Sequence, residues 1–338
     1  GYDAGPGVGN AQWRIEKRNL TTGALIAGFG TAGVVISNPS TSDDYAFAIT
    51  ADASGIYVAG YDNSPGSAQW RIEKRDLTTG ALIAGFGKGG VVTSNPSAFT
   101  DYVYAITTDA SGIYIAGFNW NLAFNEEWRI EKRDKSTGAL IGGFGTAGAI
   151  TSNPSTSLDI ARAITADASG IYVAGWDQVT GNSQWRIEKR DLTTGAFVAA
   201  FGTGGVVTNN PNIGWDVIYA ITADASGIYA AGYDFSAGSN SQWRIEKRDL
   251  TTGALLCTQT SNPSTSSDYA FAITADASGI YVAGSDFIPG NYQWRIEKYD
   301  FCGAVLPVEL LSFSGSCNTA HEYFREVSIH WETATEIN

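Results

Sequence analysis

Five aspartates recur at equivalent places along the chain, and their side chains are the best suited to chemistry. Each stands eight residues before a second aspartate, and the five are Asp44, Asp101, Asp159, Asp216 and Asp268. Carboxylate oxygens are the ligands that Ca²⁺ prefers, so a ring of such residues could hold a hard cation. The alternative, which the pattern favours, is that each carboxylate accepts hydrogen bonds from the backbone of the loop after an Asn-Pro pair.

The same carboxylates could serve a hydrolase or a lyase acting on a polysaccharide. Glycosidases need two carboxyl groups about 5 to 10 Å apart, with the pKa of one of them raised. Equivalent acids repeated in every copy do not supply that asymmetry. The only histidines are His321 and His330, near the C-terminus, and no cysteine pair has the spacing of metal ligands. We therefore expect a protein that is not an enzyme and has no cofactor, with Ca²⁺ as the one candidate.

Aromatic residues in irregular segments form a second candidate set. Such side chains are suited to stacking on sugars or to anchoring a protein partner. The alternative is drift of surface loops without selection. The set consists of Trp120, Phe124, Trp215, Phe235, Phe287 and Tyr292.

These candidates are positioned by an internal repeat. The stretch Gln-Trp-Arg-Ile-Glu-Lys-Arg at residues 12–18 returns five more times almost unchanged, with its tryptophan at Trp13, Trp70, Trp128, Trp185, Trp243 and Trp294. Four of the five spacings are 57 or 58 residues, and the last is 51. A fixed period of this size indicates one supersecondary unit copied along the chain.

The copy from Asp44 to Ser97 shows the content of one repeat. Residues rich in β-branched and aromatic side chains alternate with Gly-containing turns, which predicts four strands: Tyr45–Asp52, Ile56–Tyr61, Gln69–Leu77 and Val91–Ser94. Four antiparallel strands at this period predict an all-β fold, a β-propeller of four-stranded blades. In an up-and-down blade, the loops after strands two and four leave from the same face. The variable, aromatic-bearing loops should therefore share that face.

Alternation along the third strand predicts how the blades associate. Trp70 and Ile72 share one face of the strand, and Arg71, Glu73 and Arg75 share the other. We expect each of the six repeated tryptophans to lie in the gap between neighbouring blades. The charged residues are either a ring of functional sites or a ladder of ion pairs that joins adjacent blades. The ladder is favoured, because a feature copied into every repeat is usually architecture.

The order of motifs in each copy resembles a known repeat. Ile-Tyr-Val-Ala-Gly, a variable loop, Lys-Arg-Asp, Thr-Thr-Gly and Gly-Phe-Gly-x-Gly-Gly-Val-Val are similar to the delta-60 repeat of bacterial secreted proteins. The resemblance covers residues 1–305 and is specific at Gly60, Gly80, Phe86, Gly87 and Gly90 and their copies. It implies a secreted β-propeller and brings no catalytic residues. It departs in the last copy, where residues 256–259 replace the Gly-Phe-Gly segment.

Residues 306–338 break the repeat. Leu-Pro-Val-Glu-Leu-Leu-Ser-Phe at 306–313 and a second segment at 327–338, which contains Trp-Glu-Thr-Ala-Thr-Glu-Ile-Asn at 331–338, predict two strands of a β-sandwich. These segments resemble the start of the immunoglobulin-like or fibronectin-like module that precedes the sorting domain in type IX secreted proteins. The resemblance implies secretion and location outside the cell or at its surface.

The number of blades depends on the first copy, which has no opening strand. Six third strands are present but only five first strands, which begin at Tyr45, Tyr102, Ile160, Val217 and Tyr269. We expect the sequence to be a piece of a longer protein. Either about 16 further residues complete a six-bladed ring, or five blades close with spare strands. Six blades are favoured.

Composition excludes some partners. The net charge of −13 argues against binding of nucleic acid, which needs a basic surface. No apolar run approaches the roughly 20 residues that span a membrane. Among Cys257, Cys302 and Cys317, one disulfide with a spare thiol and three unpaired thiols are equally compatible with the sequence. We expect a secreted, non-catalytic propeller that binds a glycan or a surface protein through its variable face, with a hydrolase or lyase, or a spacer without ligand, as alternatives.

Overall fold

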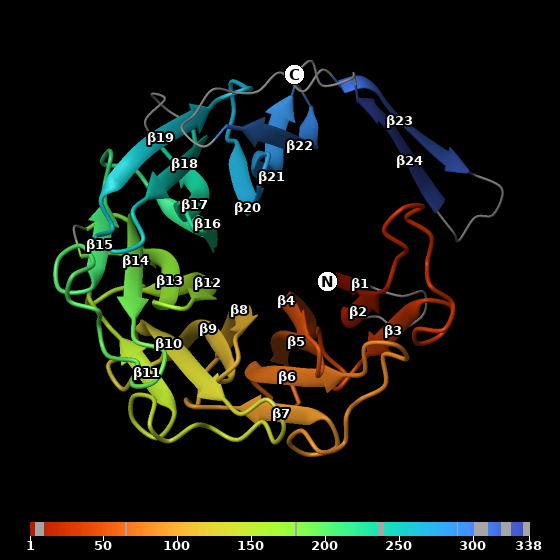
Figure 1. The fold of residues 1–338 in the computed structure, drawn as a ribbon, viewed down its shortest axis with the longest axis horizontal. Coiled ribbons are helices and arrows are strands. Elements are labelled where there is room, and N and C mark those ends of the chain that lie inside the picture. Colours follow the sequence, from red (N-terminus) through yellow and green to blue (C-terminus); the bar gives the residue numbers. More distant parts are fainter. Residues whose placement is uncertain are drawn as a thin grey trace.

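The computed structural model describes residues 1–3, 10–64, 66–179, 181–235, 240–288 and 290–300, together with the backbone of residues 310–318 and 326–333. Every regular element in these residues is a β-strand, so the predicted all-β class is confirmed. No helix in this part of the chain is long and apolar enough to cross a membrane. The sheets are antiparallel and stand side by side around a centre, as the blades of a propeller (Figure 1).

Six sheets form six blades, each named by its order in the chain. Blade 1 contains β1 (Tyr2–Asp3), β2 (Gln12–Glu16) and β3 (Val34–Ser37). Blade 2 contains β4 (Tyr45–Asp52), β5 (Gly55–Asp62), β6 (Gln69–Arg75) and β7 (Val91–Ser94). Blade 3 contains β8 (Tyr102–Thr108), β9 (Ile113–Trp120), β10 (Glu126–Arg133) and β11 (Ala149–Ser152).

The second half of the ring repeats this plan. Blade 4 contains β12 (Ile160–Asp167), β13 (Gly170–Asp177), β14 (Gln184–Arg190) and β15 (Val206–Asn209). Blade 5 contains β16 (Val217–Asp224), β17 (Gly227–Asp234), β18 (Gln242–Arg248) and β19 (Leu255–Ser261). Blade 6 contains β20 (Tyr269–Asp276), β21 (Gly279–Ile288) and β22 (Asn291–Tyr299).

The strand predictions for blade 2 agree closely with its structure. β4 and β7 have the predicted bounds, and β5 is one residue longer at each end. β6 ends at Arg75, two residues before the predicted end, because the Asp76 carboxylate caps the following turn. Its Oδ1 accepts hydrogen bonds from the backbone N–H groups of Thr78 and Thr79, at 3.0 and 2.7 Å.

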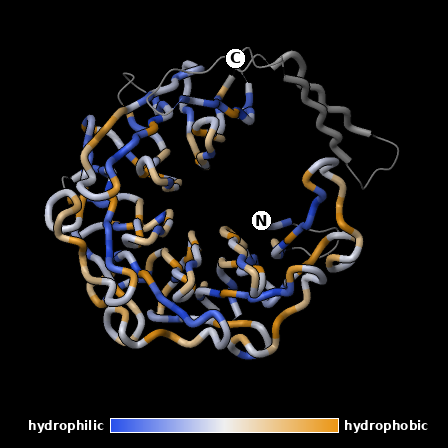
Figure 2. The backbone as a smooth tube through the Cα atoms, in the orientation of Figure 1, coloured by the Kyte–Doolittle hydropathy of each residue, from blue (hydrophilic) through white to orange (hydrophobic). Residues whose placement is uncertain are grey.

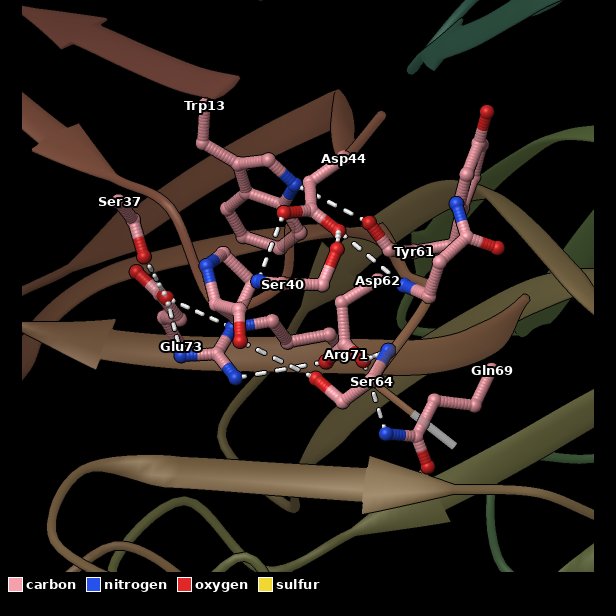
Figure 3. A network of polar contacts seen from close by, with 12 residues as sticks. Trp13, Ser37, Ser40, Asp44, Tyr61, Asp62, Ser64, Gln69, Arg71 and Glu73 are labelled. Carbon is pink, nitrogen blue, oxygen red and sulfur yellow. Dashed lines mark hydrogen bonds and ion pairs between the residues drawn. The ribbon is translucent and has the colours of Figure 1, made fainter. Parts of the chain in front are cut away.

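The repeated tryptophans join each blade to the next. The indole Nε1 of Trp13 in blade 1 donates a hydrogen bond to the carbonyl oxygen of Tyr61 in blade 2, at 3.2 Å (Figure 3). Its side chain is fully buried against Ala46, Ile56 and Val58 of the same neighbour. The same bond, at 3.1 to 3.3 Å, is made by Trp70, Trp128, Trp185 and Trp243.

The charged face of the third strand packs against the preceding blade. Glu73 is fully buried and pairs with Arg71 and Arg75 on its own strand, at 2.8 and 2.5 Å. It also accepts a hydrogen bond from Ser37 Oγ of blade 1, at 2.6 Å (Figure 3). The predicted ion pairs are present, but they run along one strand and not between blades. The link between blades is made by the serine. The third strands, such as β6, β10, β14 and β18, are seen in Figure 2 as the largely hydrophilic stretches of their blades.

A second contact between blades explains two motifs of the repeat. The backbone N–H of Gly30 in blade 1 donates to the carbonyl of Thr79 in blade 2, at 2.8 Å. Gly80 follows with φ of 72°, and a Cβ there would lie 2.9 Å from the Phe29 ring. The Gly-Phe-Gly segment of one blade therefore holds the Thr-Thr-Gly turn of the next, and only glycine fits at the contact.

The two ends of the ring are open in the described residues. In this part of the chain, blade 1 has no inner strand and blade 6 has no fourth strand (Figure 1). The prediction that all six tryptophans lie between blades is wrong for Trp294, whose side chain is 89% exposed, with Ile296 beside it at 73%. No described blade packs on that face of β22. On the opposite end, Arg14 and Arg18 are correspondingly exposed.

The segment after blade 6 contains a two-stranded antiparallel sheet, formed by β23 (Leu310–Asn318) and β24 (Glu326–Thr333). Its strands overlap the two predicted for a β-sandwich. The proposed domain boundary at residue 305 and the segment at 306–309 lie outside the described residues, as does Cys302. The module and the disulfide therefore remain predictions.

Trp185 and Trp294 offer a matched test of these interfaces, because they occupy the same repeat position in opposite environments. Trp185→Ala should lower the free energy of unfolding by about 3 to 5 kcal/mol, since it empties a buried site and removes a hydrogen bond. Trp294→Ala should change it by less than about 0.5 kcal/mol, since an exposed ring loses little. Equal losses in chemical denaturation would show that the blade 6 face is covered.

Candidate functional site

The five recurring aspartates close the loops that enter the inner strands. Asp44 Oδ1 accepts hydrogen bonds from Ser40 Oγ at 2.7 Å and from the backbone of Asn63 at 3.1 Å, and its Oδ2 accepts one from the backbone of Ser40 at 3.0 Å (Figure 3). All five side chains are fully buried, and equivalent bonds hold Asp101, Asp159 and Asp268. The carboxylates proposed for Ca²⁺ therefore have structural partners. Nowhere in the described residues do three or more His, Cys, Asp or Glu side chains form a group that could hold a metal.

Asp216 differs from the other four. Asn212 stands where they have a serine, and its Nδ2 donates to Asp216 Oδ1 at 3.2 Å. Burial raises the pKa of Asp216 to about 7, against the lowering effect of a hydrogen bond from the Phe235 backbone. Burial also raises the pKa of Asp101 and of Asp159, and a fully buried side chain cannot reach a substrate.

Two of the predicted aromatic residues meet in blade 3. Trp120 at the end of β9 and Phe124 in the β9–β10 loop both contact Phe99, which comes from the loop entering the blade, with ring centroids 5.9 and 5.4 Å apart. Phe124 is 69% exposed. The loops after strands two and four therefore meet on one face here, as predicted.

The other four aromatic residues lie elsewhere. Trp215 is 53% exposed and contacts Trp176 of blade 4, with centroids 6.3 Å apart. Phe235 packs closely on the backbone of Gly214. A Cβ added at that glycine would lie only 2.4 Å from the Phe235 Cβ. Phe287 and Tyr292 contact each other in blade 6, with centroids 5.0 Å apart. The six predicted residues thus fall into separate clusters.

The blade 3 cluster lines a surface groove. We call it the blade 3 groove, formed by Phe99, Trp120 and Phe124 together with the polar side chains of Asn119, Glu127 and Arg129. Leu122, which is fully exposed, stands at its edge. An apolar surface with a few convergent polar groups is typical of a ligand-binding site.

The polar residues of the groove replace a triad found in other blades. In blade 2, Asp62 is buried and accepts hydrogen bonds from Gln69 and Arg71, at 2.9 and 3.4 Å (Figure 3). An equivalent Arg–Asp pair occurs in blades 1, 4, 5 and 6. Blade 3 has Asn119 and Glu127 in place of the Asp and Gln. Its negative charge therefore sits on the half-buried Glu127 and not on a buried aspartate.

Asn119 is left incompletely satisfied by this exchange. Its Nδ2 donates to the carbonyl of Trp120 and to Glu127 Oε1, both at 3.0 Å. Its Oδ1 is buried and has no hydrogen-bond partner, and the residue is only 5% exposed. A buried acceptor without a partner costs about 1 to 3 kcal/mol.

A further set of residues lines the inner strands and was not found by sequence reasoning. Each innermost strand contains a β-bulge that leaves one residue out of the pairing. These residues contact one another from blade to blade, and we call them the channel ring: Phe47, Tyr104, Arg162, Tyr219 and Phe271. An alignment of the repeats with one another would have revealed Arg162, because it stands where the other copies have Phe or Tyr.

The comparisons with known proteins add nothing on the site. No protein-family model and no curated protein matches the chain. A solved structure of an alpha-L-arabinanase from Cellvibrio cellulosa, in complex with arabinohexaose, is similar at a TM-score of 0.35 and 13% identity. The match covers 83% of this chain and 93% of that one. Likeness at this level carries no argument about function.

Asp216 predicts a pH effect on stability. Its pKa is higher in the folded protein than the usual value near 3.9, so the folded state binds more protons between about pH 4 and pH 7. Its contribution to the free energy of unfolding should therefore fall as the pH rises through this range. Asn212→Ser restores the partner present in the other blades and should weaken this dependence. Denaturation at pH 4.5 and 7.5 would contradict the assignment if both proteins behaved alike.

Proposed function

We propose that this protein is a secreted or cell-surface propeller that binds a glycan in the blade 3 groove, without catalysis. The observation that supports this most is the exchange of the buried Asp–Gln–Arg arrangement for Asn119, Glu127 and Arg129 beside the exposed aromatic rings. Five blades keep the Arg–Asp pair that stabilises the strand, and blade 3 does not.

The groove has the two kinds of contact that sugars use. Trp120 and Phe124 present ring surface for the apolar face of a pyranose or furanose. The Glu127 carboxylate accepts hydrogen bonds from hydroxyl groups, and Arg129 donates them. A protein partner would be expected to need a larger apolar surface.

Hydrolysis is the second candidate, and it rests on a different carboxyl group from the recurring aspartates. Burial raises the pKa of Glu126, which is next to the groove residue Glu127. A half-buried acid with a raised pKa is suited to protonate a leaving group. Turnover of an oligosaccharide that is lost in Glu126→Gln would replace the binding proposal with this one.

Substitutions in the groove test the binding proposal. Trp120→Ala and Phe124→Ala should each weaken binding of a glycan found on an array by about tenfold, because each removes a stacking surface. Trp215→Ala, which removes an aromatic side chain from another cluster, is the control and should have little effect. Binding that depends on Trp215 and not on Trp120 would place the site on another blade.

A double substitution separates binding from folding. Asn119→Asp with Glu127→Gln gives blade 3 the arrangement of the other blades and leaves the net charge unchanged. The variant should be at least as stable as the parent in thermal denaturation, since the unpartnered acceptor becomes an ion-pair partner of Arg129. Its glycan binding, measured by calorimetry, should fall at least tenfold. Unchanged affinity would contradict the role assigned to the exchange.

A further inference from the structure

Arg162 is the one cationic member of the channel ring. The bulge positions of the other four described inner strands carry Phe or Tyr. A ring made of aromatic side chains would complete the packing at this place, so packing alone does not call for an arginine.

Arg162 also differs from every other arginine in the described residues. The remaining eleven form ion pairs with an aspartate or glutamate within 3.4 Å. Arg162 forms none, and its Nε is buried without a hydrogen-bond partner. A partly buried charge without a counterion is costly, and it is retained mainly where a site requires it.

The neighbouring rings orient the guanidinium group. Its Cζ lies 4.0 Å from the centroid of the Tyr104 ring and 5.8 Å from that of Tyr219. Stacking on rings uses the faces of the planar group. Apart from the donor that bonds the Tyr104 hydroxyl group, the N–H donors at its edge are left available. Those donors match the two oxygens of a carboxylate.

The surroundings do not neutralise this charge. Burial raises the pKa of Tyr104 to about 12, so the phenol is neutral at physiological pH. Glu126 feels the charge of Arg162, but the two do not form an ion pair within 4.0 Å. Tyr104 and the groove residue Trp120 pack against the same cluster of side chains, which links the channel ring to the groove.

We propose that Arg162 binds the carboxylate of a uronic acid residue in the glycan held by the blade 3 groove. This inference rests on the proposed function and names the sugar class. The net charge of −13 repels long polyanions, so the ligand is a short acidic oligosaccharide or one with a single acidic residue. Beyond about 10 Å this repulsion is screened at physiological salt, and the local contact dominates.

Calorimetric titration with a panel of uronic acid trimers and their methyl esters tests the inference. The panel contains galacturonate, glucuronate and mannuronate, and each ester replaces the charged carboxylate of its acid by a neutral methyl ester. The full chain should bind at least one acid about 10 to 100 times more tightly than its ester, the usual worth of a hydrogen-bonded charge.

Two variants assign the preference to Arg162. Arg162→Tyr introduces a residue that other blades carry at this position, so it should fold, and it should reduce the preference for acid over ester to less than about threefold. Arg162→Lys keeps the charge but loses the planar edge, and should retain only part of the preference. Thermal melts of both variants check the fold.

The outcomes separate the two proposals. Equal binding of acid and ester, or a preference that survives in Arg162→Tyr, overturns the role of Arg162 and leaves glycan binding standing. Absence of binding to these trimers and to every neutral glycan on an array overturns both. Binding of an acidic peptide in place of the sugars also overturns the inference.

Discussion

The hydrogen bond from each repeated tryptophan to a carbonyl of the next blade is the contact on which the structure depends. It joins residues 48 positions apart in the first four interfaces, and 42 apart in the last. A buried indole N–H must find an acceptor, and this acceptor lies on the neighbour's second strand. The buried glutamate and its two arginines then face the same interface from the other side. The stability of each blade therefore depends on its neighbours, as in other repeat proteins.

This dependence explains why the repeat is so uniform and where it departs. The Gly-Phe-Gly segment serves the Thr-Thr-Gly turn of the next blade, through the bond of Gly30 to Thr79 and its copies. Blade 5 has no Gly-Phe-Gly segment, and the sequence after Tyr299 has no Thr-Thr-Gly turn. Both changes therefore concern the same contact, the one between the Gly-Phe-Gly segment of a blade and the Thr-Thr-Gly turn of the next. The exchanges at Asn119, Glu127 and Arg162 have no such explanation in the interfaces, and they lie in one sector of the ring.

Most of the fold could be predicted from the sequence, because its period, strand alternation and turn glycines report local geometry. The bounds of β4 and β7 and the common face of two loop classes followed from these signals. The exposure of Trp294 did not, since it depends on what covers β22. The site was found only in part: Trp120 and Phe124 were expected, whereas Asn119 and Arg162 were missed. The buried acceptor of Asn119 and the β-bulge at Arg162 both depend on how the strands pack. The type of a single residue does not reveal such features.

The central claim is that the ligand site lies where one repeat departs from the others. The indole N–H signals in ¹H–¹⁵N spectra test it, because the ten tryptophans include interface, groove and exposed examples. During titration with an oligosaccharide that binds, the Trp120 signal should shift, while those of Trp70, Trp185 and Trp243 stay in place. A shift confined to Trp215 or Trp294, with Trp120 unmoved, would contradict the account.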